Sequence, residues 1–320
     1  MFQRAVRKGL GWGVAASAAC ALAACELIAT SEPSLTPRAR PAVATPAPDV
    51  AQPTSKKSAS LRQYFNQVQQ AQLSQGLLRQ DGGGVDTPFS ADILARNFER
   101  IAFFNEYDGA FSGLGGASPL RRWADPVRID ILFGDSVPPS QQQADTAAIR
   151  GYANRLARTT GHPVSKTSVR ANFLVLVASE DDRASLLAEA ARRLPGISDA
   201  SLRALTDMRR DTYCAVAAYA TGSDPNTYTA AVTVIRSENP DLLRLSCVHE
   251  ELAQGLGLAN DSPAARPSIF NDDDEFALLT DHDELLLAML YDERLRPGML
   301  AGEAAPLTRI IARELTTGPL

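Results

Sequence analysis

Residues 247–261 read CVHEELAQGLGLAND, and the polar residues in this stretch recur at the spacing of a helix that ends in a turn. Glu250 and Gln254 are four residues apart and so share a helical face, while Glu251 lies about 100° around the axis from Glu250. Gly257 follows Gln254 by three residues, and Asn260 follows Gly257 by three. The stretch therefore has the pattern E-E-x-x-Q-x-x-G-x-x-N.

This pattern resembles the metzincin zinc-peptidase pattern H-E-x-x-H-x-x-G-x-x-H at every spacing. The resemblance puts Glu250, Gln254 and Asn260 at the three metal-ligand positions and Glu251 at the general-base position. It also puts Gly257 at the turn that returns the third ligand to the metal. No histidine of the pattern is kept.

Two other observations bear on which residue of the stretch is aligned with the first metal ligand of the pattern; the alignment that starts at Glu250 is called the metzincin register. If His249 were the first ligand, its partner one turn along would be Ala253, which cannot bind a metal. In the metzincin register, SIFND (268–272) stands where a turn built on methionine lies beneath the metal, with Phe270 in place of that methionine. His249 is then expected to be a half-buried packing residue.

The donor set of the predicted site is unusual for zinc, which prefers histidine nitrogen and cysteine sulfur. Amide oxygens suit calcium or magnesium when carboxylates accompany them, and Asp261 would add a second charge. We therefore expect no cofactor, with a divalent cation (zinc or calcium) as the alternative. Without a metal, Glu250, Glu251 and Gln254 would form a structural hydrogen-bond network.

The remaining sequence predicts an α/β (α+β) fold, a zincin- or metzincin-like mixed sheet backed by helices, with an active-site-type helix and a C-terminal helix. Predicted strands are 127–133, 169–179, 212–220 and 228–237, the last being the candidate sheet edge that would pair with an extended peptide. Predicted helices are 58–80, 89–109, 141–161, 183–193, 198–208, 239–255 and 278–292, the last being the final helix. Ser90, Asn239 and Thr280 are the expected N-caps of three of them.

Several segments taken together resemble a bacterial family known as domain-of-unknown-function family 2927. They are NFERIAFFNEY (97–107), RRWADPVRIDILFG (121–134), EELAQGLGLANDS (250–262), PSIFND (267–272) and LYDERLRPGM (290–299). The resemblance covers roughly residues 88–300. It implies a fold neighbourhood and no particular activity.

The amino terminus has the order of an export signal, because Arg4, Arg7 and Lys8 precede a short apolar run. That run ends in LAAC, Leu22 to Cys25, which resembles a bacterial lipobox and implies cleavage before Cys25 and diacylation of its thiol. Cys20 and a plain secretory signal are the alternatives. Glu26 after the cysteine favours an outer-membrane anchor facing the periplasm.

The chain is accordingly divided into four parts. We expect a lipoprotein signal peptide (1–24), the lipidated cysteine with a proline-rich disordered tether (25–58), an N-terminal helix (59–85) and a metzincin-like domain (86–320). Cys214 and Cys247 remain after the anchor and are expected to form a disulfide in an oxidising compartment, with two buried thiols as the alternative.

Charge and composition exclude one class of partner. The formal net charge is −5 and no basic stripe is present, so nucleic acid is not an expected partner. Residues 271–284 are strongly acidic but lack the central glycine of an EF-hand loop, and a solvated acidic rim is expected there. His282 is expected to be a solvated residue at a helix start, and His162 to lie in a turn.

These features predict a lipid-anchored protein of the bacterial cell envelope that carries a degenerate metzincin-like domain. Its expected work is to bind a peptide or an envelope protein by strand addition. The alternatives are a metal-dependent peptidase, with Glu251 as general base, and a structural envelope factor.

Overall fold

The computed structural model describes residues 53–105, 115–271 and 273–317. All of them fall in one unit of the chain, Pro48–Leu320. The predicted signal peptide, the predicted lipidation site at Cys25 and most of the predicted tether lie outside the described residues. None of the helices in the described part of the chain is long and apolar enough to span a membrane.

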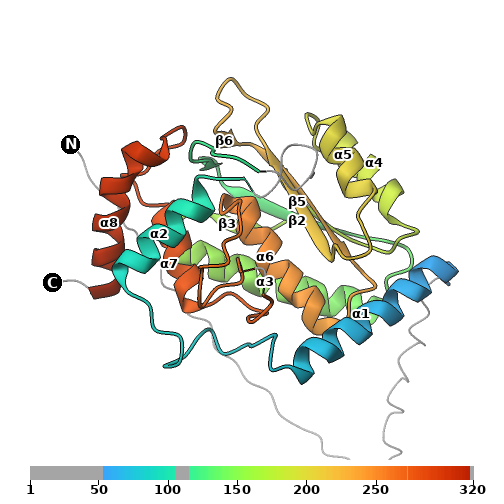
Figure 1. Ribbon diagram of the computed structural model, residues 1–320. Helices are drawn as coiled ribbons and strands as arrows, with labels where there is room; N and C mark the ends of the chain where they lie inside the picture. The colour runs from blue at the N-terminus through green and yellow to red at the C-terminus, as the bar shows by residue number, and fades with distance from the viewer. Residues whose placement is uncertain (1–52, 106–114, 272, 318–320) are drawn as a thin grey trace, which may run out of the picture. The chain divides into compact units, whose positions relative to one another are not determined.

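A five-stranded mixed sheet lies at the centre of this unit, in the order β3-β2-β4-β7-β5 (Figure 1). Its strands are β2 (Val127–Phe133), β3 (Val164–Lys166), β4 (Phe173–Ala178), β5 (Cys214–Tyr219) and β7 (Ala230–Arg236). The first four in spatial order are parallel, and β5 runs antiparallel to β7. A small parallel sheet pairs β1 (Arg122–Trp123) with β6 (Thr227–Tyr228). The predicted α/β class and mixed sheet are confirmed.

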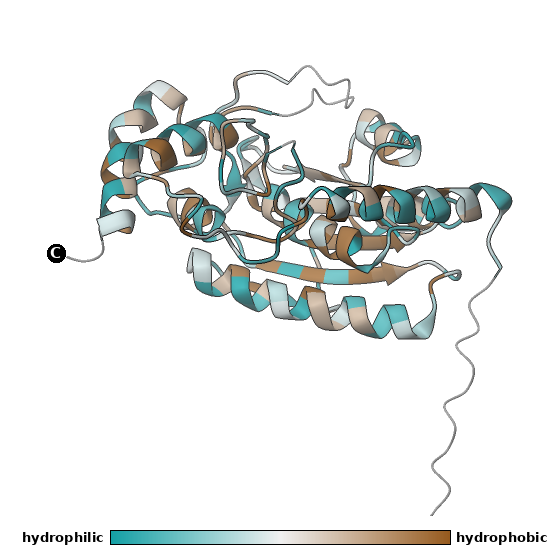
Figure 2. Ribbon diagram, turned by 60° about the horizontal axis from the view of Figure 1, so that its bottom comes forward, coloured by the Kyte–Doolittle hydropathy of each residue, from teal (hydrophilic) through white to brown (hydrophobic). Residues whose placement is uncertain are grey.

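Helices cover both faces of the main sheet. One face packs against α3 (Pro139–Thr160) and α6 (Asp241–Leu256), with α2 (Ala91–Ala102) and α7 (Asp281–Leu290) completing that core. The other face packs against α4 (Arg183–Arg193) and α5 (Asp199–Thr206). Apolar side chains that alternate along β4 enter both cores, because successive strand residues point to opposite faces. In Figure 2 the strands are mostly brown, and the helices are mixtures of teal, white and brown.

The prediction that residues 228–237 form the sheet edge is wrong. They form β7, which lies between β4 and β5 and has all seven of its residues buried. An apolar run of this kind needs a neighbour strand on each side and a helical layer on each face. The edge strands are β3 at one end of the sheet and β5 at the other, and β5, next to β7, has an alanine-rich sequence that is only partly buried.

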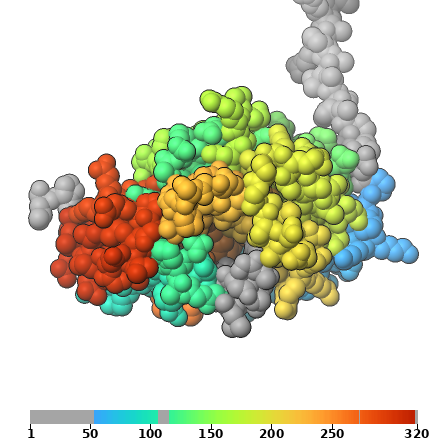
Figure 3. Space-filling view, turned by 90° about the horizontal axis from the view of Figure 1, so that it is seen from above, coloured from blue at the N-terminus to red at the C-terminus, as the bar shows by residue number. Residues whose placement is uncertain are grey.

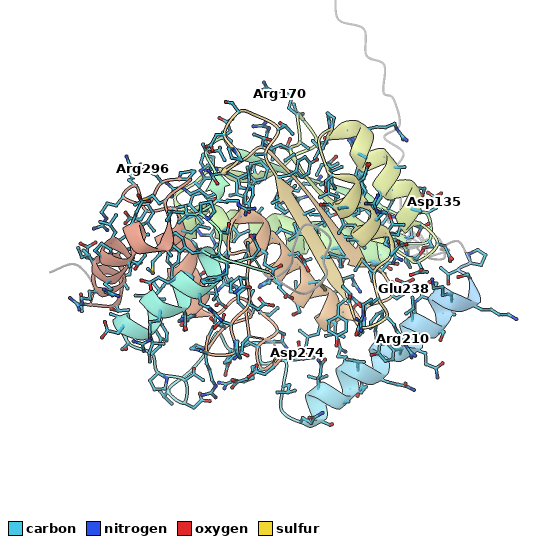
Figure 4. The ribbon with its side chains drawn as sticks, turned by 45° about the horizontal axis from the view of Figure 1, so that its top comes forward. Asp135, Arg170, Arg210, Glu238, Asp274 and Arg296 are labelled. Carbon is cyan, nitrogen blue, oxygen red and sulfur yellow. A yellow bond between two sulfur atoms is a disulfide. The ribbon has the colours of Figure 1, made fainter. Side chains whose placement is uncertain are left out.

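The amino-terminal helix α1 spans Lys56–Ser74, a range that is shorter at its carboxyl end than predicted and begins inside the predicted tether. It stops just before Gly76, whose φ of 78° does not continue a helix. The Ser58 hydroxyl donates to Glu238 Oε1 over 2.7 Å, and Gln72 Nε2 donates to Asp274 Oδ2 over 2.6 Å. Figure 4 labels the two acceptors, Glu238 and Asp274. The helix is thus bonded at both ends to the same unit as the sheet.

The last helix is α8 (Ala301–Thr317), not the predicted helix at 278–292. It packs beside α2, where the Thr308 hydroxyl donates to Glu99 Oε1 over 2.7 Å. Figure 3 shows this red carboxyl-terminal region and the yellow residues of α4 and α5 at opposite ends of one face. No helix is predicted over residues 301–317, where Pro306 is a residue that disfavours a helix interior.

Helix starts were predicted well where a side chain caps the helix. Ser90 and Thr280 accept hydrogen bonds from the backbone three residues on, and Thr280 forms a complete capping box with Asp283. The prediction of Asn239 as a cap is wrong, because Pro240 is the residue before α6. The Asn239 amide instead donates to the Tyr213 carbonyl and to Cys247 Sγ.

The predicted disulfide between Cys214 and Cys247 is present, and it links the first residue of β5 to the middle of α6 with Cα atoms 5.8 Å apart. The bond closes a loop with a sequence separation of 33 residues. In the chain-entropy model such a loop adds about 3 to 4 kcal/mol by restricting the unfolded chain. The edge strand and the helix beneath it are therefore held together covalently.

Replacing both cysteines, Cys214→Ala with Cys247→Ala, is expected to lower the free energy of unfolding by about 3 to 4 kcal/mol. The measurement is urea unfolding followed by circular dichroism, in a reference chain where Cys20 and Cys25 are serine so that no other thiol reacts. A loss of less than about 1 kcal/mol would contradict a stabilising role for the bond.

Candidate functional site

The helix predicted to carry the site, α6, is buried along most of its length. Arg244 near its start forms a buried ion pair with Asp145 of α3, with Nε and Oδ1 2.9 Å apart. Near its end the Trp123 indole N–H donates to the Gly255 carbonyl over 2.8 Å. These contacts fix the position of the side chains between them, including Glu250, Glu251 and Gln254.

Glu250 and Glu251 lie together at the start of the edge strand. A carboxylate oxygen of each and Cys214 Sγ all lie within 4.8 Å of one another. Glu251 is buried, with 4% of its surface exposed, and Glu250 is half-buried. The structure therefore brings two of the predicted site residues to the sulfur of the disulfide.

Gln254 and Asp261 form a second group, in which Gln254 Nε2 approaches Asp261 Oδ1 at 3.5 Å. Asn260 is turned elsewhere, because its amide donates to the Arg100 carbonyl at the end of α2 (3.0 Å) and to the Asp261 carbonyl (2.8 Å). Of the two residues predicted after the glycine turn, Asp261 rather than Asn260 has its side chain at Gln254.

The glycine turn itself has a clear physical cause. Gly257 ends α6 with a φ of 131°, which side-chain-bearing residues rarely adopt. A Cβ atom there would also collide with the Arg121 carbonyl oxygen. Glycine is thus the residue that lets the chain leave α6 and pass this close to β1.

Phe270, predicted at the turn below the site, is fully buried. Its turn is held by the buried carboxylate of Asp283, which accepts from the Ser268 hydroxyl (2.5 Å) and the Ile269 N–H (3.0 Å). No local pattern indicates that Asp283, which also completes the capping box of α7, bonds the 268–270 turn, because those contacts span 14 or 15 residues. The turn is therefore fixed by α7 and not by a metal-site methionine.

These residues do not fit a zinc site of the metzincin kind. The carboxylates of Glu250 and Glu251 lie beside Cys214 Sγ, and this sulfur is joined to Cys247 in a disulfide, so neither sulfur is a thiolate. The one imidazole on α6 lies elsewhere, since His249 Nδ1 accepts from the Leu279 N–H over 3.0 Å and the ring stacks on Tyr152. We derive no reaction step through zinc.

Comparison with known protein families identifies the chain. The family model described as "Protein of unknown function (DUF2927)" matches residues 91–310. The chain belongs to this family. No curated protein and no solved structure matches the chain.

The DUF2927 match confirms the family resemblance seen in the sequence. It begins at the start of α2 and ends inside α8, so it includes every strand of both sheets and the whole of α6. The candidate site lies within the part of the chain that the family model describes, and α1 lies outside it.

His249 is a packing residue in this DUF2927 chain, as predicted, but it is buried more deeply than expected. Its ring stacks on Tyr152 of α3 with centroids 4.0 Å apart, and its carbonyl accepts from the Tyr152 hydroxyl over 2.7 Å. Burial, with a smaller contribution from Arg155, lowers the pKa of His249 from its ordinary 6.5 to about 3.

The other two histidines lie away from α6. The prediction of His282 as a solvated residue is wrong, because it is fully buried, its Nε2 lies 3.0 Å from the Asn97 amide, and its ring packs edge-on against Phe89. His162 lies beyond the end of α3 as predicted, 2.9 Å from the Asp125 carbonyl.

The acidic segment 271–284 is partly neutralised by arginines that the sequence did not connect to it. Glu275 accepts from Arg79 (3.0 Å) and from Arg266 (2.6 Å). Asp272 lies outside the described residues. The segment is therefore an ion-paired junction with the chain after α1, and not a uniform acidic rim.

The buried neutral His249 predicts a particular dependence of stability on pH. Its pKa is lower in the folded chain, so the stability that its neutral form contributes is fully present above about pH 6.5 and is lost as the pH falls toward 3. In His249→Asn, the amide oxygen can accept the Leu279 N–H but cannot titrate. Urea midpoints measured from pH 7 to pH 4 are expected to fall more steeply for the wild-type chain, and parallel curves would contradict the assignment.

Proposed function

We propose that this domain binds an extended peptide, which adds to the sheet as a strand beside β5 and lies over α6. The observation that carries the proposal is the direction of the backbone groups of β5. Among the residues that the structure describes, β7 is the one strand of the main sheet that pairs with β5.

The hydrogen-bond pattern shows which backbone groups of β5 point outward. The Arg236 N–H donates to the Tyr213 carbonyl, so residues 213, 215, 217 and 219 face β7 in an alternating antiparallel ladder. The hydrogen bonds on the other side of β7 agree with this assignment. The Ala231 N–H donates to the carbonyl of Asn172, just before β4, and the Ser237 N–H donates to the carbonyl of Ala178 in β4, so alternate residues of β7 face β4 and the residues between them face β5. The N–H and C=O groups of residues 214, 216 and 218 are therefore directed to the outer edge.

The side chains next to this edge indicate what kind of peptide fits. Val216 packs close to Gly255, whose position leaves no room for a larger residue because a Cβ atom there would collide with the Phe173 ring. Glu250 and Glu251 lie at the Cys214 end of the strand. Small apolar contacts in the middle and two carboxylates at one end favour a peptide with a cationic side chain at that end.

The metzincin-like interpretation belongs to the same proposal. An antiparallel edge strand beside a helix that ends in a glycine turn supports it. Glu250, Gln254 and Asn260 occupy the sequence positions that this interpretation assigns to metal ligands, but the Asn260 amide donates to the Arg100 carbonyl and the three do not form a zinc site. We therefore infer binding without catalysis. The lipidated Cys25 and a place in the bacterial envelope, at the outer membrane facing the periplasm, are further parts of the proposal that rest on the sequence.

Ala218→Pro tests strand addition, because it removes an N–H directed to the outer edge while leaving the bonds to β7 in place. Ala218→Val is the matched control, since it keeps the N–H. The probes are fluorescent peptides of about eight residues that alternate valine with either lysine or glutamate. We expect the lysine peptide to bind the wild-type chain and the valine variant, and to bind the proline variant about tenfold more weakly.

Two results of the same titrations would contradict the proposal. Equal affinity of the proline and valine variants would exclude strand addition at β5. Equal binding of the lysine and glutamate peptides would exclude a role for Glu250 and Glu251 in peptide choice. Fluorescence anisotropy gives both results, and circular dichroism verifies that each variant is folded.

A metal-dependent peptidase is the second candidate, favoured by the closeness of the Glu250 and Glu251 carboxylates. In that case Glu251 would act as general base. We expect the oxidised chain, purified without chelator, to carry far less than one equivalent of zinc by elemental analysis, because its donor set is poor. Stoichiometric zinc together with peptidase activity that Glu251→Gln abolishes would replace the binding proposal with this one.

A further inference from the structure

The disulfide and the two glutamates form a cluster whose chemistry changes with its redox state. In the oxidised chain the sulfurs of Cys214 and Cys247 are bonded to each other. A carboxylate oxygen of Glu250 and one of Glu251 lie within 4.8 Å of Cys214 Sγ and of each other. Reduction would leave two thiols and two carboxylates in the same small volume.

We propose that the reduced chain binds one thiophilic divalent cation, such as zinc or cadmium, through Cys214, Cys247, Glu250 and Glu251. This site goes beyond the proposed peptide binding and does not depend on it. It also differs from the ligand set that the metzincin pattern implies, because that set contains no cysteine and includes Gln254 and Asn260.

The distances suit such a site. Zinc binds thiolate sulfur at about 2.3 Å and carboxylate oxygen at about 2.0 to 2.2 Å, so neighbouring donors of a tetrahedral site are about 3.3 to 3.8 Å apart. The carboxylate oxygens and Cys214 Sγ lie within 4.8 Å of one another, so these three donors need movements of about 1 Å to close on a cation. Glutamate side chains have three rotatable bonds and can supply this movement without displacing α6 or β5. The two sulfurs, bonded to each other in the oxidised chain, must also separate to about 3.8 Å after reduction.

Burial and hydrogen bonding point to a cation as well. Cys247 and Glu251 expose 2% and 4% of their surface, and Cys214 exposes 9%. Anionic groups in so little contact with water are stabilised by a bound divalent charge. The Asn239 amide donates to Cys247 Sγ over 3.6 Å, which orients that sulfur and stabilises its thiolate.

The chemical steps balance with a dithiol as reductant. The dithiol loses two electrons and two protons and forms its own disulfide, while the bond between Cys214 and Cys247 breaks and each sulfur gains a proton. Each thiol then gives its proton to the buffer as its sulfur bonds the cation. Metal binding to the reduced chain therefore releases protons.

The test uses the full chain with Cys20→Ser and Cys25→Ser, reduced with dithiothreitol and transferred to reductant-free anaerobic buffer. Cadmium is the probe, because its bonds to thiolates give an ultraviolet charge-transfer band. We expect one equivalent to bind, and we expect competition by zinc. Glu250→Gln with Glu251→Gln is expected to weaken binding at least about 10- to 100-fold, since even groups behind the direct ligands contribute that much in metal sites.

Glu293→Gln is the matched control, because this exposed carboxylate lies outside the cluster and its loss should leave the affinity unchanged. The oxidised chain, and a chain that also has Cys214→Ser and Cys247→Ser, should show no charge-transfer band. Cadmium should also raise the melting temperature of the reduced chain in a concentration-dependent way.

Three results would overturn the proposal. The first is an affinity that the two glutamine substitutions leave unchanged, which would indicate binding by thiols alone. The second is absence of cadmium binding to a reduced chain that circular dichroism shows to be folded. The third is loss of the fold on reduction with no recovery when cadmium is added, because the site exists only in the folded chain.

Discussion

Burial of β4 and β7 on both faces is the constraint from which the rest of the structure follows. Every residue of both strands is buried, so each strand needs neighbours on both sides and helices above and below. The helices α3 and α6 supply one layer, and α4 and α5 supply the other. The partly buried β5 is left at one edge, and α6, which follows β7 directly, packs against β5 and β7.

The candidate site is a consequence of this arrangement. Cys247 on α6 meets Cys214 at the start of β5, and one turn further on the helix brings Glu250 and Glu251 to the same place. Gly257 then allows the chain to turn tightly against the Arg121 carbonyl. A sheet edge, a disulfide and two carboxylates therefore occupy one small region, and both the peptide-binding proposal and the metal-binding proposal arise from that coincidence.

The spacing of residues 250–260 predicted some positions in the candidate site correctly and others not. The resemblance to the metzincin pattern implied a glycine turn after Gln254, and α6 does end at Gly257. Beyond the turn, spacing alone could not choose between Asn260 and Asp261. The carbonyl of Arg100, far away in the sequence, binds the Asn260 amide and leaves Asp261 to face Gln254.

The sequence by itself determined the α/β class, most strands and helices, the capped starts at Ser90 and Thr280, and membership of the DUF2927 family. These properties depend on periodicity, local capping and motifs that lie within one segment. The tertiary structure alone decided that β5 and not β7 is the edge, that His282 is buried against Asn97, and that Asp283 holds the turn at Phe270. Each of these outcomes depends on which distant segments compete for the same burial or the same hydrogen bond, and no local pattern contains that information.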